Sequence, residues 1–453
     1  MIKFVDSRIL LTQNIIGMKI SLLRSSVILI TATIWYSTVF AQDVPASVNR
    51  IVAGIPVNYD EALVGTYTLP DPLVKLNGKK VRNANTWYRK RRPEIVSLFE
   101  EFQYGRMPAV PKDMSFYVFD KGTPALEGKA LRKQVTVYFT KDTSDYKMDI
   151  LIYLPANTKG PVPLFLNVSF SPNAMVANDP GIKAGTMWGR DGKRVPVIRT
   201  GGFGRMNINQ FLSEGIAYGN IYYGDIEPDF AKGYKYGIRS YYQKPDTTYP
   251  APDKWGAISA WAWGLSRAMD YLETDAQIDA KKIALFGVSR LGKAVLWAGA
   301  HDQRFGMVIA SCGGEGGAAI SRRNYGENID HMTHPSRYFY QFAGNWRNYK
   351  DDFSKSPVDG HMLVALMAPR PLLLQTGDTD YWSDPKGEFV AAVNGGPVYE
   401  LLGKKALGTD IMPGAGQPVL NDLGYFMHAG GHGALPGDYE VFIRFIKMHF
   451  FNR

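Results

Sequence analysis

Short apolar runs alternate with stretches of helical spacing along most of the chain. Five of these runs consist mostly of apolar residues and are bounded by polar or turn residues: 163–168, 216–221, 283–287, 307–311 and 371–376. Strands that are apolar on both faces are typical of a parallel sheet that helices cover on both sides. Residues 255–274 and 291–300 have the spacing of such helices. The pattern therefore predicts an α/β fold with a mostly parallel central sheet flanked by helices.

The chain before these runs has a different pattern. Residues 134–139 and 148–154 are two β-rich runs separated by polar turn residues, which predicts an antiparallel hairpin. Residues 47–110 show little periodicity until a helix that is expected to begin at Pro93. We therefore expect a small N-terminal extension, residues 42–110, packed on a main α/β domain at residues 111–453.

The N-terminus has the pattern of an export signal. Residues 26–40 are apolar or small, Lys19 and Arg24 precede them, and Ala41 follows. The stretch is short for a membrane span, which needs about 20 residues. We interpret residues 1–41 as a signal peptide and upstream segment, with Met18 as an alternative start. The protein is then expected to be exported, either to a periplasm or outside the cell; an uncleaved anchor or a buried strand is the alternative interpretation.

Composition narrows the function classes further. The 453 residues are 45% hydrophobic and 21% charged, which is ordinary for a globular protein and excludes a disordered or collagen-like chain. Removal of residues 1–41 lowers the net charge from +10 to +7, and no run of five basic residues occurs. A dispersed excess of this kind favours acidic ligands weakly and nucleic acid poorly. The single cysteine, Cys312, excludes an internal disulfide and a cysteine zinc cage.

The first candidate for chemistry is a serine at the end of an apolar run. Ser289 lies between the predicted strand ending at Gly287 and a predicted helix, the setting of a nucleophile elbow. The second glycine of the usual motif stands two residues after the serine, whereas here it is Gly292, one residue later. A tight turn without catalysis is the alternative. Arg290 is placed to hold an oxyanion, and Lys293 points back towards the serine from the same helix face.

Two later segments offer an acid and a base. Asp380 follows a late apolar strand, with Asp378 and Asp384 as rivals that are commonly turn formers. His432 lies between glycines near the C-terminus, with His428 as the fallback. The order serine, acid, histidine is that of α/β hydrolases. In such a triad His432 takes the proton of Ser289 and Asp380 orients the imidazole.

Residues 287–293 resemble the elbow of the glucuronoyl esterases, carbohydrate esterase family 15, in their bacterial branch. The resemblance extends through the helix from Trp255 and six further segments: residues 223–229, 321–328, 361–363, 368–371, 382–389 and 431–433. It covers roughly residues 55–450, and several motifs in the same order make it more specific than the elbow alone. It implies the α/β-hydrolase fold.

The resemblance also implies the reaction and the substrate. The family cleaves the ester that joins 4-O-methyl-glucuronic acid on xylan to lignin alcohols, a step of plant biomass degradation. Ser289 matches the family's nucleophile, Arg290 its oxyanion arginine and His432 its base. The implied partner is therefore a glucuronoxylan or lignin–carbohydrate ester, with no cofactor and no metal.

Three further residues match the family's sugar-binding positions. Lys293 matches a lysine that holds sugar hydroxyls, Glu327 a glutamate that does the same, and Trp382 a tryptophan beside the sugar. Aromatic faces and carboxylates are suited to a pyranose, although simple packing is an alternative role for Trp382.

One position departs from the family. Where many members have the catalytic glutamate, this chain has Cys312, and Glu315 is the nearest acid. Because some bacterial relatives use an acid after the late strand, we expect Asp380 to complete the triad, with Glu315 in reserve. A xylan acetyl esterase or another carbohydrate esterase is an alternative function, and so is a catalytically silent carbohydrate-binding relative. We expect a monomer.

Overall fold

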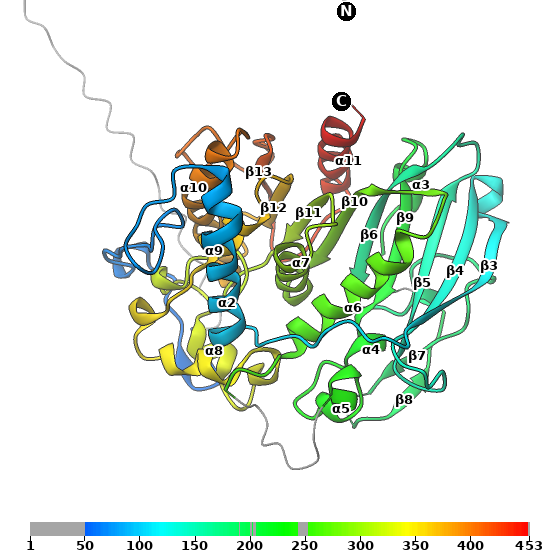
Figure 1. The fold of residues 1–453 in the computed structure, drawn as a ribbon, viewed down its shortest axis with the longest axis horizontal. Coiled ribbons are helices and arrows are strands. Elements are labelled where there is room, and N and C mark those ends of the chain that lie inside the picture. The colour runs from blue at the N-terminus through cyan, green and yellow to red at the C-terminus, as the bar shows by residue number, and fades with distance from the viewer. Residues whose placement is uncertain (1–49, 190, 200–201, 203–204, 243–251, 452–453) are drawn as a thin grey trace, which may run out of the picture. The chain divides into compact units, whose positions relative to one another are not determined.

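The computed structural model describes residues 50–189, 191–199, 202, 205–242 and 252–451. Its centre is a nine-stranded sheet in the order β13-β12-β11-β10-β6-β9-β5-β4-β3, running from β3 in cyan to β13 at the opposite edge (Figure 1). The pairs from β13 to β9 are parallel, and β5, β4 and β3 are added antiparallel. The predicted α/β fold with a mostly parallel sheet is confirmed.

The strands correspond closely to the apolar runs of the sequence. The parallel strands are β6 (Val162–Ser169), β9 (Ala217–Tyr222), β10 (Ile278–Val288), β11 (Met307–Ser311), β12 (Leu372–Gly377) and β13 (Leu423–His428). The antiparallel strands are β3 (Ser115–Ala125), β4 (Ala130–Tyr138) and β5 (Lys147–Pro155), and β4 with β5 forms the predicted hairpin. Two small pairs lie outside the main sheet: β1 (Ile51–Val52) with β2 (Ile55–Pro56), and β7 (Thr186–Trp188) with β8 (Arg194–Pro196).

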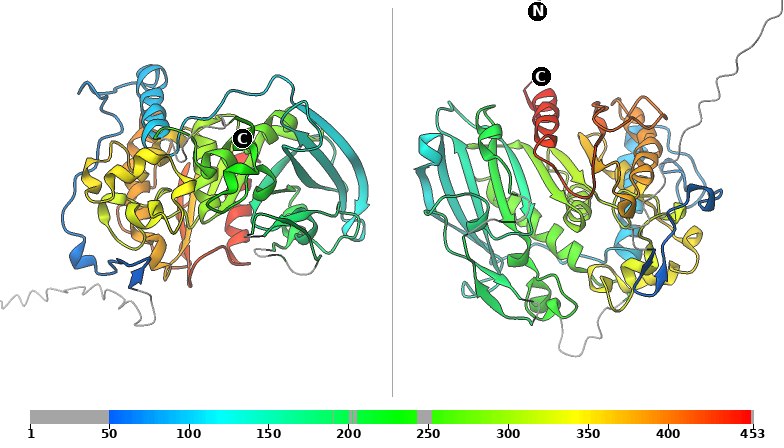
Figure 2. Two further views of the ribbon diagram at one scale, coloured as in Figure 1. Left: turned by 90° about the horizontal axis from the view of Figure 1, so that it is seen from below. Right: turned by 180° about the vertical axis from the view of Figure 1, so that it is seen from behind.

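Helices cover both faces of the sheet, because strands that are apolar on both faces must be shielded from water on both sides. The longer ones are α2 (Arg92–Phe102), α6 (Ala257–Leu272), α7 (Arg290–His301), α9 (Gly360–Met367), α10 (Pro385–Leu401) and α11 (Asp438–Phe450). The shorter ones are α1 (Ala84–Thr86), α3 (Ile208–Leu212), α4 (Tyr223–Ile226), α5 (Ile238–Tyr242) and α8 (Ile329–Thr333). In both views of Figure 2, α2, α9 and α10 gather over the half of the sheet that is far from β3 and β4.

Successive side chains of each strand point to opposite faces of the sheet, and this alternation divides the core into two clusters. Leu164 and Leu166 of β6 pack with α6, α7 and α9 on one face, while Phe165 between them packs with α3 and α11 on the other. Phe165 stacks on Phe211 of α3, with ring centroids 4.4 Å apart. The carboxyl ends of the parallel strands are thereby held at one rigid edge.

The segment before β3 contacts the core through hydrogen bonds as well as apolar packing. The Tyr104 hydroxyl donates to the carbonyl of Gly316 at 2.7 Å, and Nε2 of His361 lies 2.7 Å from the carbonyl of Pro70. The described residues, from 50 to 451, form one compact unit, and the domain boundary expected near residue 110 stays a prediction. The predicted signal segment, residues 1–41, lies outside the described residues. Within the part of the chain that the structure describes, no helix is both long enough and apolar enough to cross a membrane.

Candidate active site

Ser289 lies on a sharp turn between β10 and α7. Its backbone has φ 61° and ψ −128°, a conformation that L-residues rarely adopt. A Cβ added to Gly287 would lie 2.5 Å from the carbonyl oxygen of Leu291, and one added to Gly292 would lie 2.6 Å from that of Ser311. Gly292, the glycine one place beyond the usual motif, is thus required because α7 passes too close to β11 there for a side chain. The displaced glycine is compatible with a nucleophile elbow.

Four neighbouring strand ends carry the candidate residues. Ser289 follows β10, Cys312 follows β11, Asp380 lies three residues beyond β12 and His432 four beyond β13. Because these strands are parallel and adjacent, their carboxyl ends meet at one edge of the sheet. The Ser289 N–H donates to the carbonyl of Ser311 at 2.8 Å, which ties the elbow to the strand that carries Cys312.

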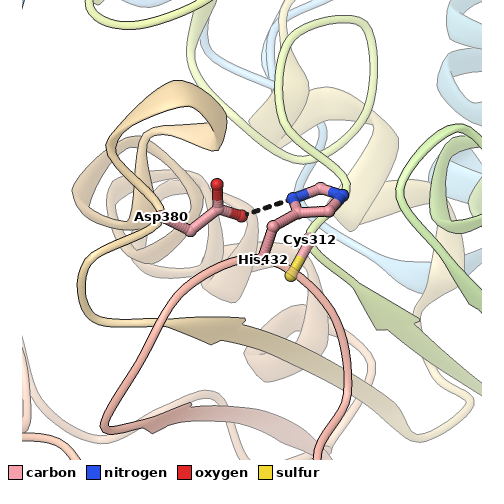
Figure 3. A group of neighbouring side chains, drawn as sticks. All are labelled: Cys312, Asp380 and His432. Atoms are coloured by element: carbon pink, nitrogen blue, oxygen red, sulfur yellow. Dashed lines mark hydrogen bonds and ion pairs between the residues drawn. The ribbon is translucent and has the colours of Figure 1, made fainter. Parts of the chain in front are cut away.

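Asp380 and His432 form the central pair of the site (Figure 3). Oδ2 of Asp380 lies 2.8 Å from Nδ1 of His432; the carboxylate is buried, while the imidazole exposes 40% of its surface. Burial opposes ionisation of both groups, but their mutual attraction outweighs it, lowering the pKa of Asp380 and raising that of His432. In the described residues, Oγ of Ser289 makes no hydrogen bond to His432. Free catalytic sites commonly close that contact only when substrate binds.

Cys312 lies against the same histidine. Its sulfur accepts the N–H of Gly433 at 3.2 Å, and one ligand atom from each of Cys312, Asp380 and His432 lies within 4.8 Å of the others. Three such groups could hold a soft metal ion, but Nδ1 of His432 is already bonded to Asp380. The arrangement fits a hydrogen-bonded acid–histidine pair, with the thiol of Cys312 beside it.

The rival acids have other partners. Asp378 accepts the N–H of Gly430 at 2.8 Å and so joins the loops after β12 and β13. Asp384 caps α10 through the N–H of Gly387 and pairs with Arg323 at 2.8 Å. Neither of these acids contacts His432 in the structure.

The reserve acid and the reserve histidine are also engaged elsewhere. Glu315 is buried and accepts the hydroxyl proton of Ser321 at 2.6 Å. His428 is buried with Asp438, with 2.8 Å between Nδ1 and Oδ2, and its Nε2 lies 2.9 Å from the carbonyl oxygen of Gly431. Asp380 and His432 are therefore the acid and the histidine that the geometry brings together.

Arg290 is less free than its place beside the nucleophile suggests. Its Nη1 lies 2.5 Å from Oδ2 of Asp229, and Asp229 also accepts hydrogen bonds from Tyr340 and Gln341, both at 2.8 Å. The guanidinium lies 4.7 Å from the ring centroid of Tyr338, and 27% of the side chain stays exposed. Asp229 compensates the charge of Arg290 while holding the group beside Ser289. Sequence reasoning missed this role, although Asp229 lies in a segment that carries the family resemblance.

Lys293 and Glu327 form a buried ion pair. Nζ of Lys293 lies 2.9 Å from Oε1 of Glu327 and donates to the carbonyl of Gly313 at 2.7 Å. The same carboxylate oxygen accepts the N–H of Glu315 at 3.0 Å. Both side chains are more than nine-tenths buried, so the lysine does not present a free ammonium group.

Trp382 lies beside this pair and is half-buried. The carbonyl of Trp382 accepts the N–H of Glu327 at 2.8 Å, and its ring meets that of His331 edge-on at 5.2 Å. The guanidinium of Arg337 lies 5.2 Å from the indole centroid. Part of the indole surface is thus used for internal packing and part is open to solvent.

The fold and this edge of the sheet define the class of protein. The central sheet and its helices are those of an α/β-hydrolase, and the strained serine and the paired acid and histidine lie at the strand ends where that fold carries its catalytic groups.

Comparison with known proteins identifies the family. Residues 182–403 match the profile of the family described as glucuronyl esterase, fungi. Over 400 residues the chain is 42% identical to carbohydrate esterase MZ0003 from an unknown prokaryotic organism, covering 86% of this chain and 92% of the relative. Over 86% of this chain and all of the other, it is 45% identical to the structure of a glucuronoyl esterase from Solibacter usitatus, with a TM-score of 0.82. A CE15 esterase from a marine bacterial metagenome, described as promiscuous, is 42% identical over 87% of this chain and all of its own, with a TM-score of 0.80.

The chain therefore belongs to carbohydrate esterase family 15, the glucuronoyl esterases, and is a carboxylic ester hydrolase.

Proposed function

We propose that the protein hydrolyses 4-O-methyl-glucuronoyl esters, including those that link glucuronoxylan to lignin alcohols. The observation that carries the proposal is the Asp380–His432 pair at the strand ends next to the Ser289 elbow. Curated relatives support the substrate class: a 4-O-methyl-glucuronoyl methylesterase from Phanerochaete carnosa is 25% identical over 78% of this chain and 74% of its own length.

The first half of the reaction forms an acyl-enzyme. Nε2 of His432 takes the proton of the Ser289 hydroxyl as Oγ attacks the uronoyl carbonyl carbon. Arg290 and a backbone N–H of the elbow hold the resulting oxyanion, and His432 returns the proton to the leaving alcohol.

The second half releases the uronate. A water molecule loses a proton to His432 and attacks the acyl carbon, and the Ser289 oxygen leaves with that proton. Asp380 stays ionised throughout, because it stabilises the imidazolium and fixes the ring. In this proposal the Lys293–Glu327 pair and the open part of Trp382 contact the sugar hydroxyls and ring.

A xylan acetyl esterase remains the competing function, because charge near the nucleophile does not separate the two substrates. The cations of Arg290 and Lys293 each face a carboxylate at 2.9 Å or less. The acyl group of a glucuronoyl ester is itself uncharged, since its carboxyl group is esterified, so selectivity for it must come from contacts with the sugar ring.

The test is hydrolysis of benzyl glucuronate beside acetylated xylan, with Ser289→Ala in parallel. We expect cleavage of the uronate ester and its loss in the variant. Release of acetate with no cleavage of the uronate ester would replace the proposed substrate. Absence of turnover of any ester, with retained binding of glucuronoxylan, would indicate a silent carbohydrate-binding relative.

We further propose that residues 1–41 direct export and that the enzyme acts as a monomer. The basic and apolar pattern of the N-terminus supports export. Fractionation of expressing cells, followed by N-terminal sequencing of the exported protein, tests cleavage near Ala41. Light scattering of the purified protein tests the monomer.

A further inference from the structure

Glu388 is a buried carboxyl next to the site that the proposed mechanism does not use. It lies on the first turn of α10 and has no exposed surface. Its Oε1 accepts the N–H of Gly314 at 2.7 Å. Its Oε2 has no hydrogen-bond partner among the residues that the structure describes. A buried carboxylate with one oxygen unsatisfied is costly, whereas a neutral carboxyl is much less so.

The backbone that Glu388 holds is a turn linking two parts of the site. Cys312 begins this turn. Its sulfur accepts a hydrogen bond from the backbone N–H of Gly433, the residue after His432. The carbonyl oxygen of Gly313 accepts a hydrogen bond from the ammonium group of Lys293. Gly314 itself has a left-handed backbone with φ 53°, and a Cβ there would lie 2.3 Å from Oε1 of Glu327. The turn at residues 312–315 therefore joins the histidine loop to the Lys293–Glu327 pair, and Glu388 holds its middle.

The charges around Glu388 favour its neutral form. Burial raises the pKa of Glu388 to about 8, with Asp380 and Asp384 adding to the rise and the Gly314 N–H and Lys293 opposing it. Lys293 is already paired with Glu327, so it offers little compensation.

Three further titratable groups lie on elements packed against α10, and one of them, His428 of β13, is paired with Asp438. On β13, Tyr425 has a raised pKa, chiefly through burial and partly through Glu388 itself, and its hydroxyl donates to the carbonyl of Pro385. On α9, Nε2 of His361 lies against the carbonyl of Pro70. These neighbours supply no free positive charge to Glu388.

We propose that Glu388 is a positioning residue of the esterase, whose neutral carboxyl fixes the turn at residues 312–315 and, through it, the loop of His432. The inference rests on the proposed function for its link to catalysis. Ionisation of Glu388 adds a negative charge near Asp380 and His432. That charge favours the imidazolium and so reduces the share of His432 able to act as a base.

Glu388→Gln and Glu388→Ala separate this role from simple packing. Glutamine reproduces the neutral carboxyl, because its carbonyl can accept the Gly314 N–H and it carries no ionisable proton. Alanine leaves that N–H without an acceptor, which should lower kcat by about tenfold. Glu400→Gln, at an exposed position of the same helix, is the matched control.

The decisive readout is the ratio of kcat/KM for Glu388→Gln to that of the wild type, measured from about pH 6 to about pH 9 on any ester that the wild type hydrolyses. We expect a ratio near one at low pH that rises above about pH 8, where only the wild type ionises at this position. A flat ratio, or a loss of activity in glutamine as large as in alanine, would overturn the proposal.

Thermal unfolding provides a test that needs no substrate. The folded protein keeps the Glu388 proton to about pH 8, while an unperturbed glutamate loses it near 4.5. Wild-type stability should therefore fall through this group as pH rises between these values, and the glutamine variant should not share that fall. The Tm advantage of Glu388→Gln over the wild type should grow from about pH 5 to about pH 8, with no such trend for Glu400→Gln. Equal Tm differences at both pH values would contradict a neutral Glu388 even if the enzyme acts on another ester.

Discussion

Two histidine–aspartate pairs meet near the end of β13, with their histidines four residues apart in the chain, and the pairs differ in what surrounds them. His432 with Asp380 and His428 with Asp438 both have 2.8 Å between Nδ1 and Oδ2. His432 is partly exposed and makes no hydrogen bond through Nε2 in the described structure, whereas Nε2 of His428 faces the Gly431 carbonyl and its ring is buried. The proposed catalytic role of His432 therefore depends on its open second nitrogen as well as on its carboxylate partner.

The largest expected effect is at His432. Replacement by alanine removes the general base, so kcat on a glucuronoyl ester should fall by about 10⁶-fold, as for loss of a triad histidine. Stopped assays at high enzyme concentration measure the residual rate, with the melting temperature as a control for folding. An activity within tenfold of the wild type would move the base to another residue.

Asp380→Asn should rank next. It leaves the hydrogen-bond geometry nearly intact but removes the charge that stabilises the imidazolium, and the expected loss in kcat is about 10⁴-fold. Because Asp380 raises the pKa of His432, the acid limb of the kcat/KM profile should move to lower pH in the variant. If Asp380→Asn stays active and the acid limb of its kcat/KM profile does not move, another acid faces His432. Asp378→Asn is the matched control on the same loop, and its effect should be small.

Asp438→Asn tests the buried pair, in which Asp438 is the partner of His428. Asp438 accepts both from the Leu435 N–H at 2.7 Å and from His428, so its replacement should cost about 1–3 kcal/mol of unfolding free energy. The activity of the folded variant should stay within about threefold of the wild type, since neither group reaches Ser289. Chemical denaturation and steady-state kinetics on the same preparation separate the two effects. A loss like that of Asp380→Asn would mean that the two pairs are coupled.

Cys312→Ala should have a smaller effect. It removes a weak sulfur acceptor from the Gly433 N–H, and we expect kcat to fall by less than about tenfold. A loss comparable to that of Asp380→Asn would make the thiol an essential part of the triad.

The smallest expected effect is that of a chelator. No step of the proposed mechanism uses a metal ion, so incubation with EDTA should leave kcat unchanged. The measurement compares kcat on the same ester before and after the incubation. Inactivation that added metal reverses would instead assign an ion to Cys312, Asp380 and His432.

The sequence by itself determined the fold class, the main strands and the serine at the end of one of them. Apolar runs such as residues 283–287 predict buried strands because side chains on both faces must be covered, and β10 and its neighbours follow them closely. The hairpin of β4 and β5 and the order of Ser289, Asp380 and His432 were also readable, since local pattern and chain order need no long-range information.

Only the tertiary structure decided which acid faces the histidine and how the cations are compensated. The sequence favoured Asp380 but left Asp378 and Asp384 as rivals, and their roles differ because the three carboxylates meet different partners, Gly430, His432 and Arg323. Asp229 is 61 residues from Arg290 in the chain, so no local pattern could reveal the pair. Packing of distant segments fixes which charges meet, and in a buried site those meetings decide both the protonation states and the chemistry.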